Sequence, residues 1–262
     1  MAQSVEISNN KNIKFLIKTF EKIPVRIWNN DVDCCMHIAK SIALAIRQRQ
    51  QDGKNIVLGL ATGSTPINLY RELIRMHKEE GLSFHNVITF NLDEYFPMQP
   101  TMAQSYVRFM HEYLFDHIDI PADQVHIPDG TLELEAVAKY CDEYERKIKL
   151  NGGIDIQLLG IGRTGHVGFN EPGSWLDSKT RLVRLDSLTM RDARKDFHRE
   201  EDVPFRAITM GIDTIMKAKT IYLMAWGQHK ADIVCRAVEG EISAHVPCTY
   251  LQKHKDVRFF VD

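Results

Sequence analysis

Apolar residues follow two patterns that alternate along the chain, one with helical spacing and one short and continuous. Between Asp33 and Gly53 they recur every three or four positions, which predicts a helix that ends at Gly53. The next run, Ile56–Leu60, is short and contains β-branched residues, which predicts a buried strand. Pro66 suits the first position of a second helix, and Thr65 suits its N-cap. This stretch therefore predicts a strand, a turn and a helix.

The same order recurs through the rest of the chain. Apolar runs predict strands over 87–90, 155–159 and 221–225, and helical spacing predicts helices over 103–116, 133–150 and 230–239, with a loop over 91–101. Alternating strands and helices favour parallel strands, because a helix supplies the crossover that a parallel connection needs. We therefore expect an α/β fold with an open, mostly parallel sheet and helices on both faces.

Composition places the chain among ordinary globular proteins and limits its ligands. Of its 262 residues, 44% are hydrophobic and 26% are charged, which excludes a disordered chain. Lys and Arg number 33 against 35 Asp and Glu, and no basic tract indicates a surface for nucleic acid or membrane. An anionic ligand must therefore be bound by local contacts.

No linker or repeat divides the sequence, so we expect one domain over 24–262 after an N-terminal arm over 1–23.

Cysteine usage and the apolar runs favour the cytoplasm. The five cysteines are odd in number and form no C-x-x-C pair, which argues against a disulfide framework or a zinc knuckle. Residues 1–22 lack the apolar core of a signal peptide, and runs such as Ile221–Trp226 are too short to span a bilayer. His117 follows His111 and Glu112 at the wrong spacing for a zincin, so we expect no metal.

The chemically distinctive segments all follow predicted strands. They cover residues 62–65, 91–95, 160–171 and 227–230. In open α/β sheets, ligands bind beyond the carboxyl ends of the strands, because loops and helix N-termini meet there. We therefore expect these segments to converge on one rim of the sheet.

The first segment, Thr62, Gly63, Ser64 and Thr65, suits a phosphate or another anion. It combines hydroxyl and backbone N–H groups with the start of a helix. It is not a Walker loop, since no Gly-Lys-Ser/Thr sequence follows. The alternative is a turn that only caps the helix. The later Lys230 supplies the cation that the segment itself lacks.

Two segments carry groups suited to proton transfer. Asp93 and Glu94 follow a buried strand, where desolvation raises the pKa of a carboxyl toward that of a general base, although acidic residues are also common in exposed loops. The glycine-rich segment 160–173 contains His166 and Glu171, which a bent loop can bring together. Its glycines are followed by His, Asn and Pro rather than an apolar helix, which argues against a dinucleotide fingerprint. His166 is therefore either catalytic or structural.

Together these segments resemble those of glucosamine-6-phosphate deaminases. The matching stretches are Leu58–Pro66, Thr89–Tyr95, Gly165–Pro172 and Gly227–Ala231, in the order and spacing of that family, with support from 104–106 and 115–121. The resemblance covers almost everything from Pro24 onward. It implies a Rossmann-like fold and a cytosolic, homo-oligomeric enzyme without a cofactor, which converts glucosamine 6-phosphate to fructose 6-phosphate and ammonia.

The resemblance also implies roles for single residues in the chemistry. Asp93 matches the base that moves a proton between C2 and C1 of the sugar, and His166 matches the group that opens the ring. Glu171 matches the carboxylate that supports this histidine. Deaminases usually carry an Asp two residues before it, where this chain has Thr164, which holds no charge to stabilise an imidazolium.

For the phosphate, the resemblance implies contacts with Lys230, Ser64 and Thr65. A further family arginine falls on Arg194, or on Lys195 if a one-residue gap is introduced. We prefer Arg194, because a guanidinium can bind phosphate in a bidentate fashion.

The departures leave three functions open. Ser174 and Arg181 match an allosteric amino-sugar phosphate site of the family, but Val183 stands in place of its Lys, which puts allostery in doubt. Thr164 is compatible with an inactive paralogue or sensor that binds a sugar phosphate without turnover. A hydrolase of the 6-phosphogluconolactonase type would share the fold and the phosphate loop, yet it would not need the 91–95 segment in this form. The deaminating isomerase remains the leading hypothesis.

Overall fold

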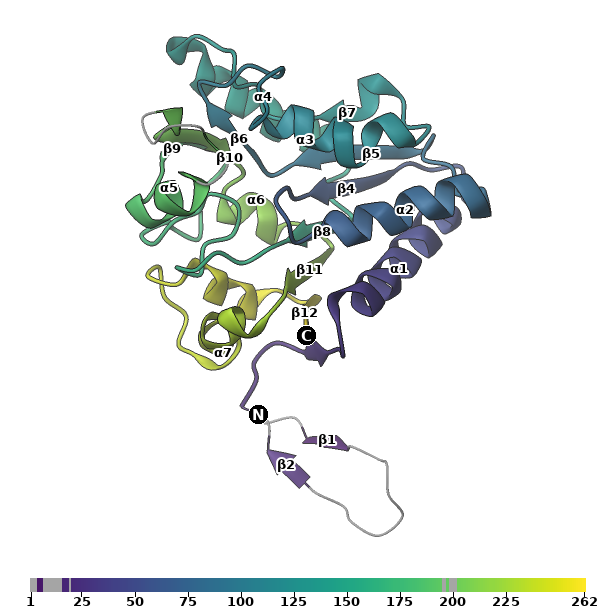
Figure 1. The fold of residues 1–262 in the computed structure, drawn as a ribbon, viewed down its shortest axis with the longest axis vertical. Coiled ribbons are helices and arrows are strands. Elements are labelled where there is room, and N and C mark those ends of the chain that lie inside the picture. The colour runs from purple at the N-terminus through teal and green to yellow at the C-terminus, as the bar shows by residue number, and fades with distance from the viewer. Residues whose placement is uncertain (1–3, 7–15, 19, 195–196, 198–201) are drawn as a thin grey trace.

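The computed structural model describes residues 4–6, 16–18, 20–194, 197 and 202–262. At its centre is a seven-stranded sheet with the strand order β3-β12-β11-β8-β4-β5-β7 (Figure 1). The strands are β3 (Val25–Ile27), β4 (Ile56–Leu60), β5 (Val87–Asn91), β7 (Val125–His126), β8 (Ile156–Leu159), β11 (Thr220–Ala225) and β12 (Val257–Val261). All neighbouring strands in it are parallel. The expected open parallel sheet is confirmed.

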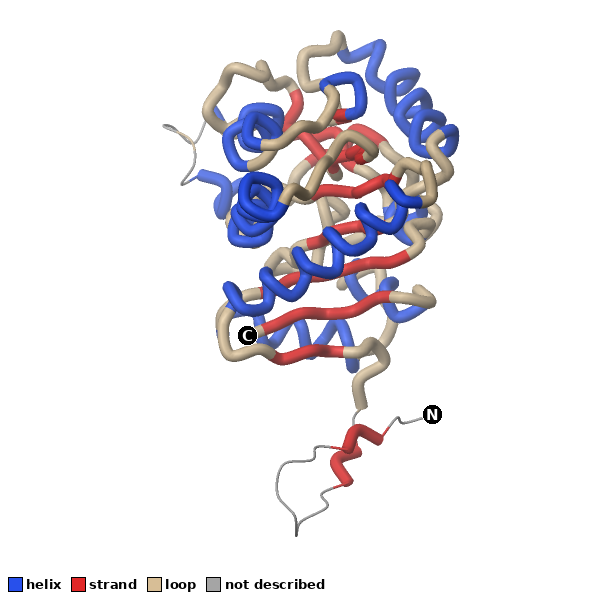
Figure 2. The backbone as a smooth tube through the Cα atoms, turned by 90° about the vertical axis from the view of Figure 1, so that its right-hand side faces the viewer, coloured by secondary structure: helices blue, strands red, loops and turns tan. Residues whose placement is uncertain are grey.

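Helices cover both faces of this sheet (Figure 2). One face carries α1 (Asp31–Gln51), α2 (Ile67–Glu80) and α3 (Tyr106–Tyr113), and the other carries α4 (Val137–Leu150), α6 (Ile212–Met216) and α7 (Ala231–Glu239). Successive strand residues point to opposite faces. Val57 and Leu58 of β4 accordingly belong to different hydrophobic cores, Val57 with Ile215 of α6 and Leu58 with Leu73 of α2.

Most predicted helices and strands agree with the observed ones, with differences at the ends of two helices and in the predicted loop over 91–101. The helices expected up to Gly53, over 133–150 and over 230–239 correspond to α1, α4 and α7. The helix expected over 103–116 is shorter at both ends. It begins later because the Ser105 hydroxyl accepts a hydrogen bond from Val107 N and caps α3, and it ends before Leu114, whose backbone is not helical. Thr65 does not cap α2, contrary to expectation. Pro66 occupies the cap position without a side-chain hydrogen bond, and Thr65 and Pro66 lie within a turn closed by Ile67 N and Ser64 O.

A second, antiparallel sheet lies beside the main one, next to α5 (Ser187–Ala193) (Figure 1). Its strand order is β6-β10-β9, with β6 (Asp93–Phe96), β9 (Arg181–Arg184) and β10 (Arg206–Thr209). The prediction of a loop over 91–101 is therefore wrong in part. Asp93 pairs with Thr209, so its strand depends on a partner far away in the sequence, which no local pattern reports.

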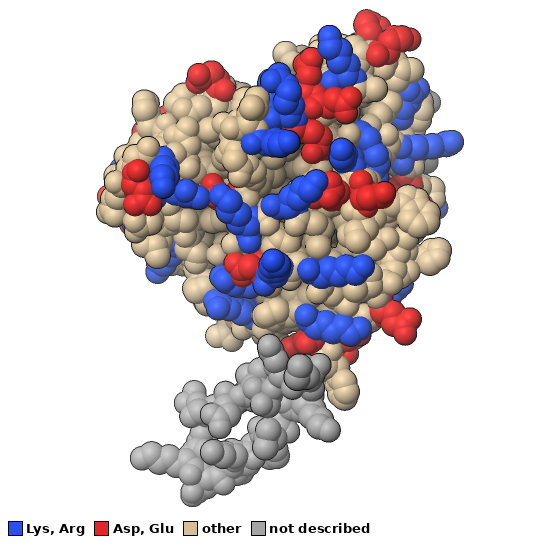
Figure 3. Space-filling model, turned by 180° about the vertical axis from the view of Figure 1, so that it is seen from behind, with Lys and Arg blue, Asp and Glu red and all other residues tan. Residues whose placement is uncertain are grey.

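The remaining elements are short. They comprise the 3₁₀ turns Phe115–His117, Ala122–Gln124, Leu134–Ala136, Gln228–Lys230 and Pro247–Lys253, and the antiparallel pair β1 (Ser4–Glu6) and β2 (Leu16–Lys18). Ile23, at the end of the expected arm, is 1% exposed and packs in a hydrophobic core. No helix of the described part is both long and apolar enough to cross a membrane. Figure 3 shows basic and acidic side chains interspersed on one face of the molecule.

Candidate active site

The chemically distinctive segments meet where four adjacent strands end. Residues 62–65 follow β4, 160–171 follow β8 and 227–230 follow β11, while β5 leads through Leu92 into β6. These strands are neighbours in the order β11-β8-β4-β5. The structure thus brings together the segments that the sequence placed on one rim.

A bent loop carries His166 and Glu171. It turns at Gly165, whose φ of 80° lies in the left-handed region that favours glycine. Cys248 N donates to Gly165 O at 2.8 Å, which ties the bend to the body of the protein. The Asn170 amide donates to Met210 O at 2.7 Å, which ties the other end to the segment after β10. Because both ends are held, the loop can fix the side chains that it carries.

Within this loop, Thr164, His166 and Glu171 form one hydrogen-bonded group. His166 Nδ1 lies 2.9 Å from Thr164 Oγ1 and 3.1 Å from Glu171 Oε2. Thr164 Oγ1 also donates to Glu171 Oε2, at 3.4 Å. One arrangement satisfies all three contacts: Nδ1 carries the proton and donates it to both oxygens. The contacts of the ring with Thr164 and Glu171 are therefore both made through Nδ1.

Glu171 is suited to holding the imidazole in this orientation. Burial raises the pKa of Glu171, but hydrogen bonding and electrostatic attraction to His166 outweigh that effect and hold the pKa below its ordinary value. The imidazole also lies directly over Gly162, where an added methyl group would overlap the ring at Nε2. Glycine at this position therefore makes room for the Nε2 edge of the His166 ring.

The two adjacent carboxyl groups of β6 have different environments. Glu94 accepts hydrogen bonds from Ser105 Oγ at 2.7 Å and Val107 N at 3.1 Å, so it holds the N-terminus of α3. Asp93 is 6% exposed, and its pKa is raised to about 8, first by burial and then by the charge of Glu94. A methyl group at Gly168 would lie 3.2 Å from Asp93 Oδ2, so Asp93 adjoins the loop of His166. Asp93 is therefore a buried carboxyl with a raised pKa next to the His166 loop.

Aromatic side chains line this end of the site, and sequence reasoning did not identify them. The Tyr106 ring is stacked on Phe169 at 6.1 Å between centroids, and Tyr95 lies 5.4 Å from Phe169 and 5.1 Å from Tyr106. Burial raises the pKa of Tyr106, with further contributions from Tyr95 and Asp93. The signal in the sequence was the tyrosine two residues after Asp93. The electrostatic interaction between Tyr106 and Asp93 places this aromatic group near the buried carboxyl.

The candidate phosphate contacts lie at the other end. Lys230 Nζ donates to Ile161 O at 2.7 Å, directly beside the site loop. Thr65 Oγ1 would lie 3.8 Å from a methyl group at Gly160, so the 62–65 turn adjoins the same segment. Ser64 and Gly63 are exposed, and Thr62 and Thr65 are half-buried. A cation and a polar turn therefore flank residues 160–161.

Arg194 is farther along the chain, at the carboxyl end of α5, with an exposed side chain. An ion pair of 2.8 Å between Arg163 and Asp192 places α5 beside the site loop. Lys195, the alternative to Arg194, lies outside the described residues. Across the described parts of the chain, no group of three or more His, Cys, Asp or Glu residues is placed to hold a metal ion.

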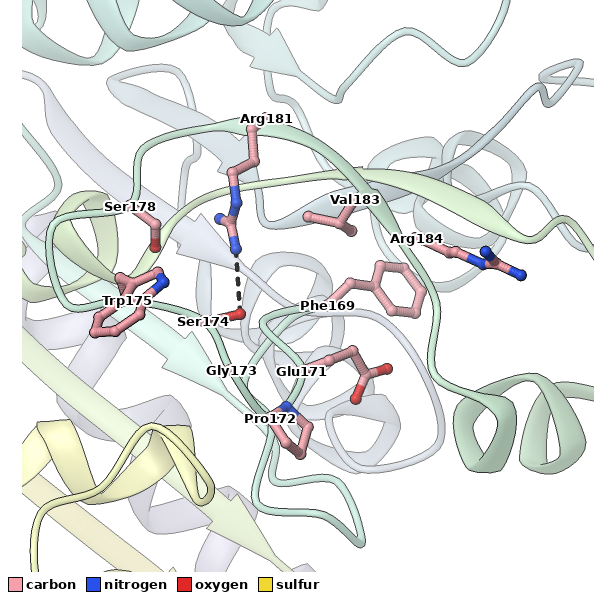
Figure 4. Close-up of a pocket in the computed structure, with 10 residues that line it drawn as sticks. All are labelled: Phe169, Glu171, Pro172, Gly173, Ser174, Trp175, Ser178, Arg181, Val183 and Arg184. Carbon is pink, nitrogen blue, oxygen red and sulfur yellow. Dashed lines mark hydrogen bonds between the residues drawn. The ribbon is translucent and has the colours of Figure 1, made fainter.

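A pocket of about 330 Å³ is lined in part by Phe169 and Glu171 of the site loop (Figure 4). Arg181 donates to Ser174 Oγ at 3.2 Å and to Asn170 Oδ1 at 2.9 Å, and burial lowers the pKa of Arg181. Ser174, Arg181 and Val183, which the sequence analysis compared with an allosteric site of the family, all line this pocket (Figure 4). Val183 contributes an apolar surface at the position where the resemblance implied a lysine.

Comparison with known proteins gives similarity along nearly the whole chain. The family described as glucosamine-6-phosphate isomerases/6-phosphogluconolactonase matches residues 29–259. A glucosamine-6-phosphate deaminase-like protein of Bacteroides thetaiotaomicron is 45% identical over 249 residues, which are 95% of this chain but only 38% of that protein. The glucosamine-6-phosphate deaminase of Thermoanaerobacter sp. is 44% identical over 225 residues, covering 86% of this chain and 88% of the relative.

Comparison of the fold with solved structures agrees with the comparison of sequences. The solved structure of a monomeric glucosamine-6-phosphate deaminase superposes with a TM-score of 0.86 at 40% identity, over 92% of this chain and 97% of that one. Sequence and fold match over the same extent, and the segments of the rim lie inside it. The chain therefore belongs to the glucosamine-6-phosphate isomerase/6-phosphogluconolactonase family.

Proposed function

We propose that this chain is a glucosamine-6-phosphate deaminase, which converts glucosamine 6-phosphate and water to fructose 6-phosphate and ammonia. The observation that carries the proposal is the buried Asp93, with a pKa of about 8, beside the hydrogen-bonded His166 and Glu171. The names of the similar proteins support the same reaction. Because the chain spans only part of one such relative, the activity of any longer protein is part of this proposal.

In the first step, His166 opens the sugar ring. Its Nε2 takes the proton of the anomeric hydroxyl and returns a proton to the ring oxygen, so the C1–O5 bond breaks and an aldehyde forms. Glu171, 3.1 Å from Nδ1, stabilises the imidazolium that forms between these transfers. Thr164 contributes a neutral hydrogen bond in place of a second carboxylate.

In the second step, Asp93 moves a proton from C2 to C1. As the C2 proton passes to Asp93, O1 takes a proton from the 2-ammonium group, which gives an enol with a neutral amino group at C2. Return of the proton from Asp93 to C1 makes the C2 iminium ion. Water then adds to C2 and passes a proton to the nitrogen, and the C–N bond breaks to give the ketone and ammonia, which leaves with its extra proton as ammonium. A carboxylate with a pKa of about 8 is a stronger base than an exposed one.

The phosphate end of the substrate binds away from these atoms. We assign it to Lys230 and the turn Thr62, Gly63, Ser64 and Thr65, with Arg194 as a further contact. The lysine supplies the charge, and the hydroxyl and N–H groups supply directional hydrogen bonds. Binding energy from this end can hold the open chain in place for the proton transfers. All steps are acid–base chemistry, so we propose that the enzyme needs no cofactor.

Two alternatives make different predictions. A sensor would bind the sugar phosphate without turnover, and the neutral Thr164 beside His166 is the observation that favours it. A lactonase would hydrolyse an ester of a sugar acid, which requires no base for a C–H proton. The buried Asp93 therefore argues for the isomerising reaction rather than the lactonase.

One assay separates the three functions. Purified protein is incubated with glucosamine 6-phosphate, and ammonia and fructose 6-phosphate are measured together, with the Asp93→Asn variant as control. Equal release of both products by the wild type alone supports the proposal. Tight binding without either product supports the sensor. Hydrolysis of 6-phosphogluconolactone, without release of ammonia from the amino sugar, supports the lactonase.

Assembly and location complete the proposal. We keep the cytoplasm as the compartment, supported by five free cysteines in the described structure. The homo-oligomer expected from the sequence competes with a monomer, since one structurally similar deaminase is described as monomeric. Sedimentation velocity at micromolar concentration distinguishes the two states.

A further inference from the structure

Trp226 joins the two halves of the candidate phosphate site. It directly follows β11, and its indole Nε1 donates to Thr65 O, in the turn after β4, at 2.9 Å. The side chain is half-buried and packs on the hydrophobic core beneath α1 and α2. Residue 230, which carries the phosphate-binding ammonium group, lies in the 3₁₀ turn that follows Trp226.

The sheet alone does not bring these two turns into contact. The strands β11 and β4 are not neighbours, because β8 lies between them. Adjacent strands are about 4.8 Å apart, so the ends of β11 and β4 are separated by roughly 10 Å. A long side chain with a donor at its far edge can cross this distance, and Trp226 has that shape.

The two turns are also tied to the segment between them. Lys230 Nζ donates to Ile161 O at 2.7 Å, beyond the end of β8. The hydrogen bond of Trp226 thus links the turns on either side of β8. Lys230 contacts the segment that follows β8 itself. Together the contacts define the distance from the Thr65 turn to the ammonium group, which is the distance that a bound phosphate must match.

We propose that Trp226 is a positioning residue for substrate phosphate, which it serves by holding the Ser64–Thr65 turn at a set distance from Lys230. The inference rests on the proposed function, because it assumes that this end of the site binds the phosphate of the substrate. Trp226 acts through Thr65 and touches no reacting atom. It therefore affects the binding of the phosphate group more than the proton transfers.

The test compares Trp226→Phe with Trp28→Phe. Trp28 packs on the same core, but its Nε1 is buried without a hydrogen-bond partner, so its replacement removes an indole without removing such a bond. For Trp226→Phe we expect the KM for glucosamine 6-phosphate and the Kd for inorganic phosphate to rise together. The expected rise is about three- to tenfold, because the loss of one hydrogen bond weakens binding by about that factor. We expect kcat to stay within about twofold, and Trp28→Phe to change neither constant.

Several results would overturn the inference. These are an unchanged Kd for phosphate in Trp226→Phe, a loss confined to kcat, or an equal rise of KM in Trp28→Phe. If thermal unfolding shows that Trp226→Phe does not fold, tryptophan is replaced throughout by its benzothiophene analogue, which keeps the ring shape and lacks the N–H group. The same rise in the Kd for phosphate is then expected, and an unchanged Kd refutes the inference.

Calorimetric titration with phosphate also separates this inference from the proposed function. A wild-type protein that binds phosphate but releases no ammonia disproves the deaminase and still tests Trp226 through the Kd. A wild-type protein that releases ammonia without measurable phosphate binding overturns the inference alone.

Discussion

Asp93 is expected to make the folded protein less stable as the pH rises. Its pKa is about 8 in the folded protein against an ordinary value of 3.8, so between these values the folded state holds a proton that the unfolded state has released. Stability then falls as the pH rises through this window and levels off above about pH 8. At about 1.4 kcal/mol per pKa unit, the cost is roughly 4 kcal/mol at pH 7 and roughly 6 kcal/mol at pH 9.

Asp93→Asn removes this cost, because an amide has the same shape and no charge to desolvate. Urea unfolding of wild type and variant at pH 5 and pH 8.5 should show the variant gaining about 4 kcal/mol of relative stability between the two conditions. Asp177→Asn, at an exposed aspartate, is the matched control and should parallel the wild type.

The same variant should lose exchange of the substrate C2 proton with solvent and about 10²–10⁴-fold in turnover, because it removes the base. In the wild type, kcat/KM should rise with pH toward about 8, since only the ionised carboxylate accepts a proton. Parallel stability curves for wild type and Asp93→Asn would refute the assignment of the raised pKa. Retained exchange would move the base to Glu94, despite its hydrogen bonds to Ser105 and Val107.

Three further substitutions test the rest of the site. Lys230→Ala should raise KM about 10- to 100-fold in steady-state assays, because a charged hydrogen bond to phosphate is lost, and an unchanged KM would contradict this. Gly162→Ala should lower kcat by at least about tenfold without weakening phosphate binding, since the added methyl group displaces the His166 ring; normal turnover would show that the ring acts from another position. Thr164→Asp should lower both the melting temperature and the rate of ammonia release, because a second carboxylate would lie beside Glu171 Oε2, now 3.4 Å from the threonine hydroxyl. Faster release at equal stability would refute it.

The sequence by itself determined the main layers of the fold. Helical spacing and short apolar runs predicted α1, α4 and α7 and the strands β4, β5, β8 and β11, because burial on one face or on both faces leaves a periodic record in a local stretch. The parallel arrangement followed from the alternation of these elements. The polar segments after the strands then indicated a site at their carboxyl ends.

Only the tertiary structure decided the details that distinguish one side chain from its neighbour. Asp93 and Glu94 look alike in the sequence, but pairing of β6 with β10 buries both, and the N-terminus of α3 engages Glu94 alone. The indole of Trp226 meets Thr65 across 161 positions of the chain. Such contacts depend on which elements meet in space, and local periodicity reports only whether a position is buried. For that reason the location of the site could be predicted from the sequence, whereas the environment of each side chain in it could be described only from the tertiary structure.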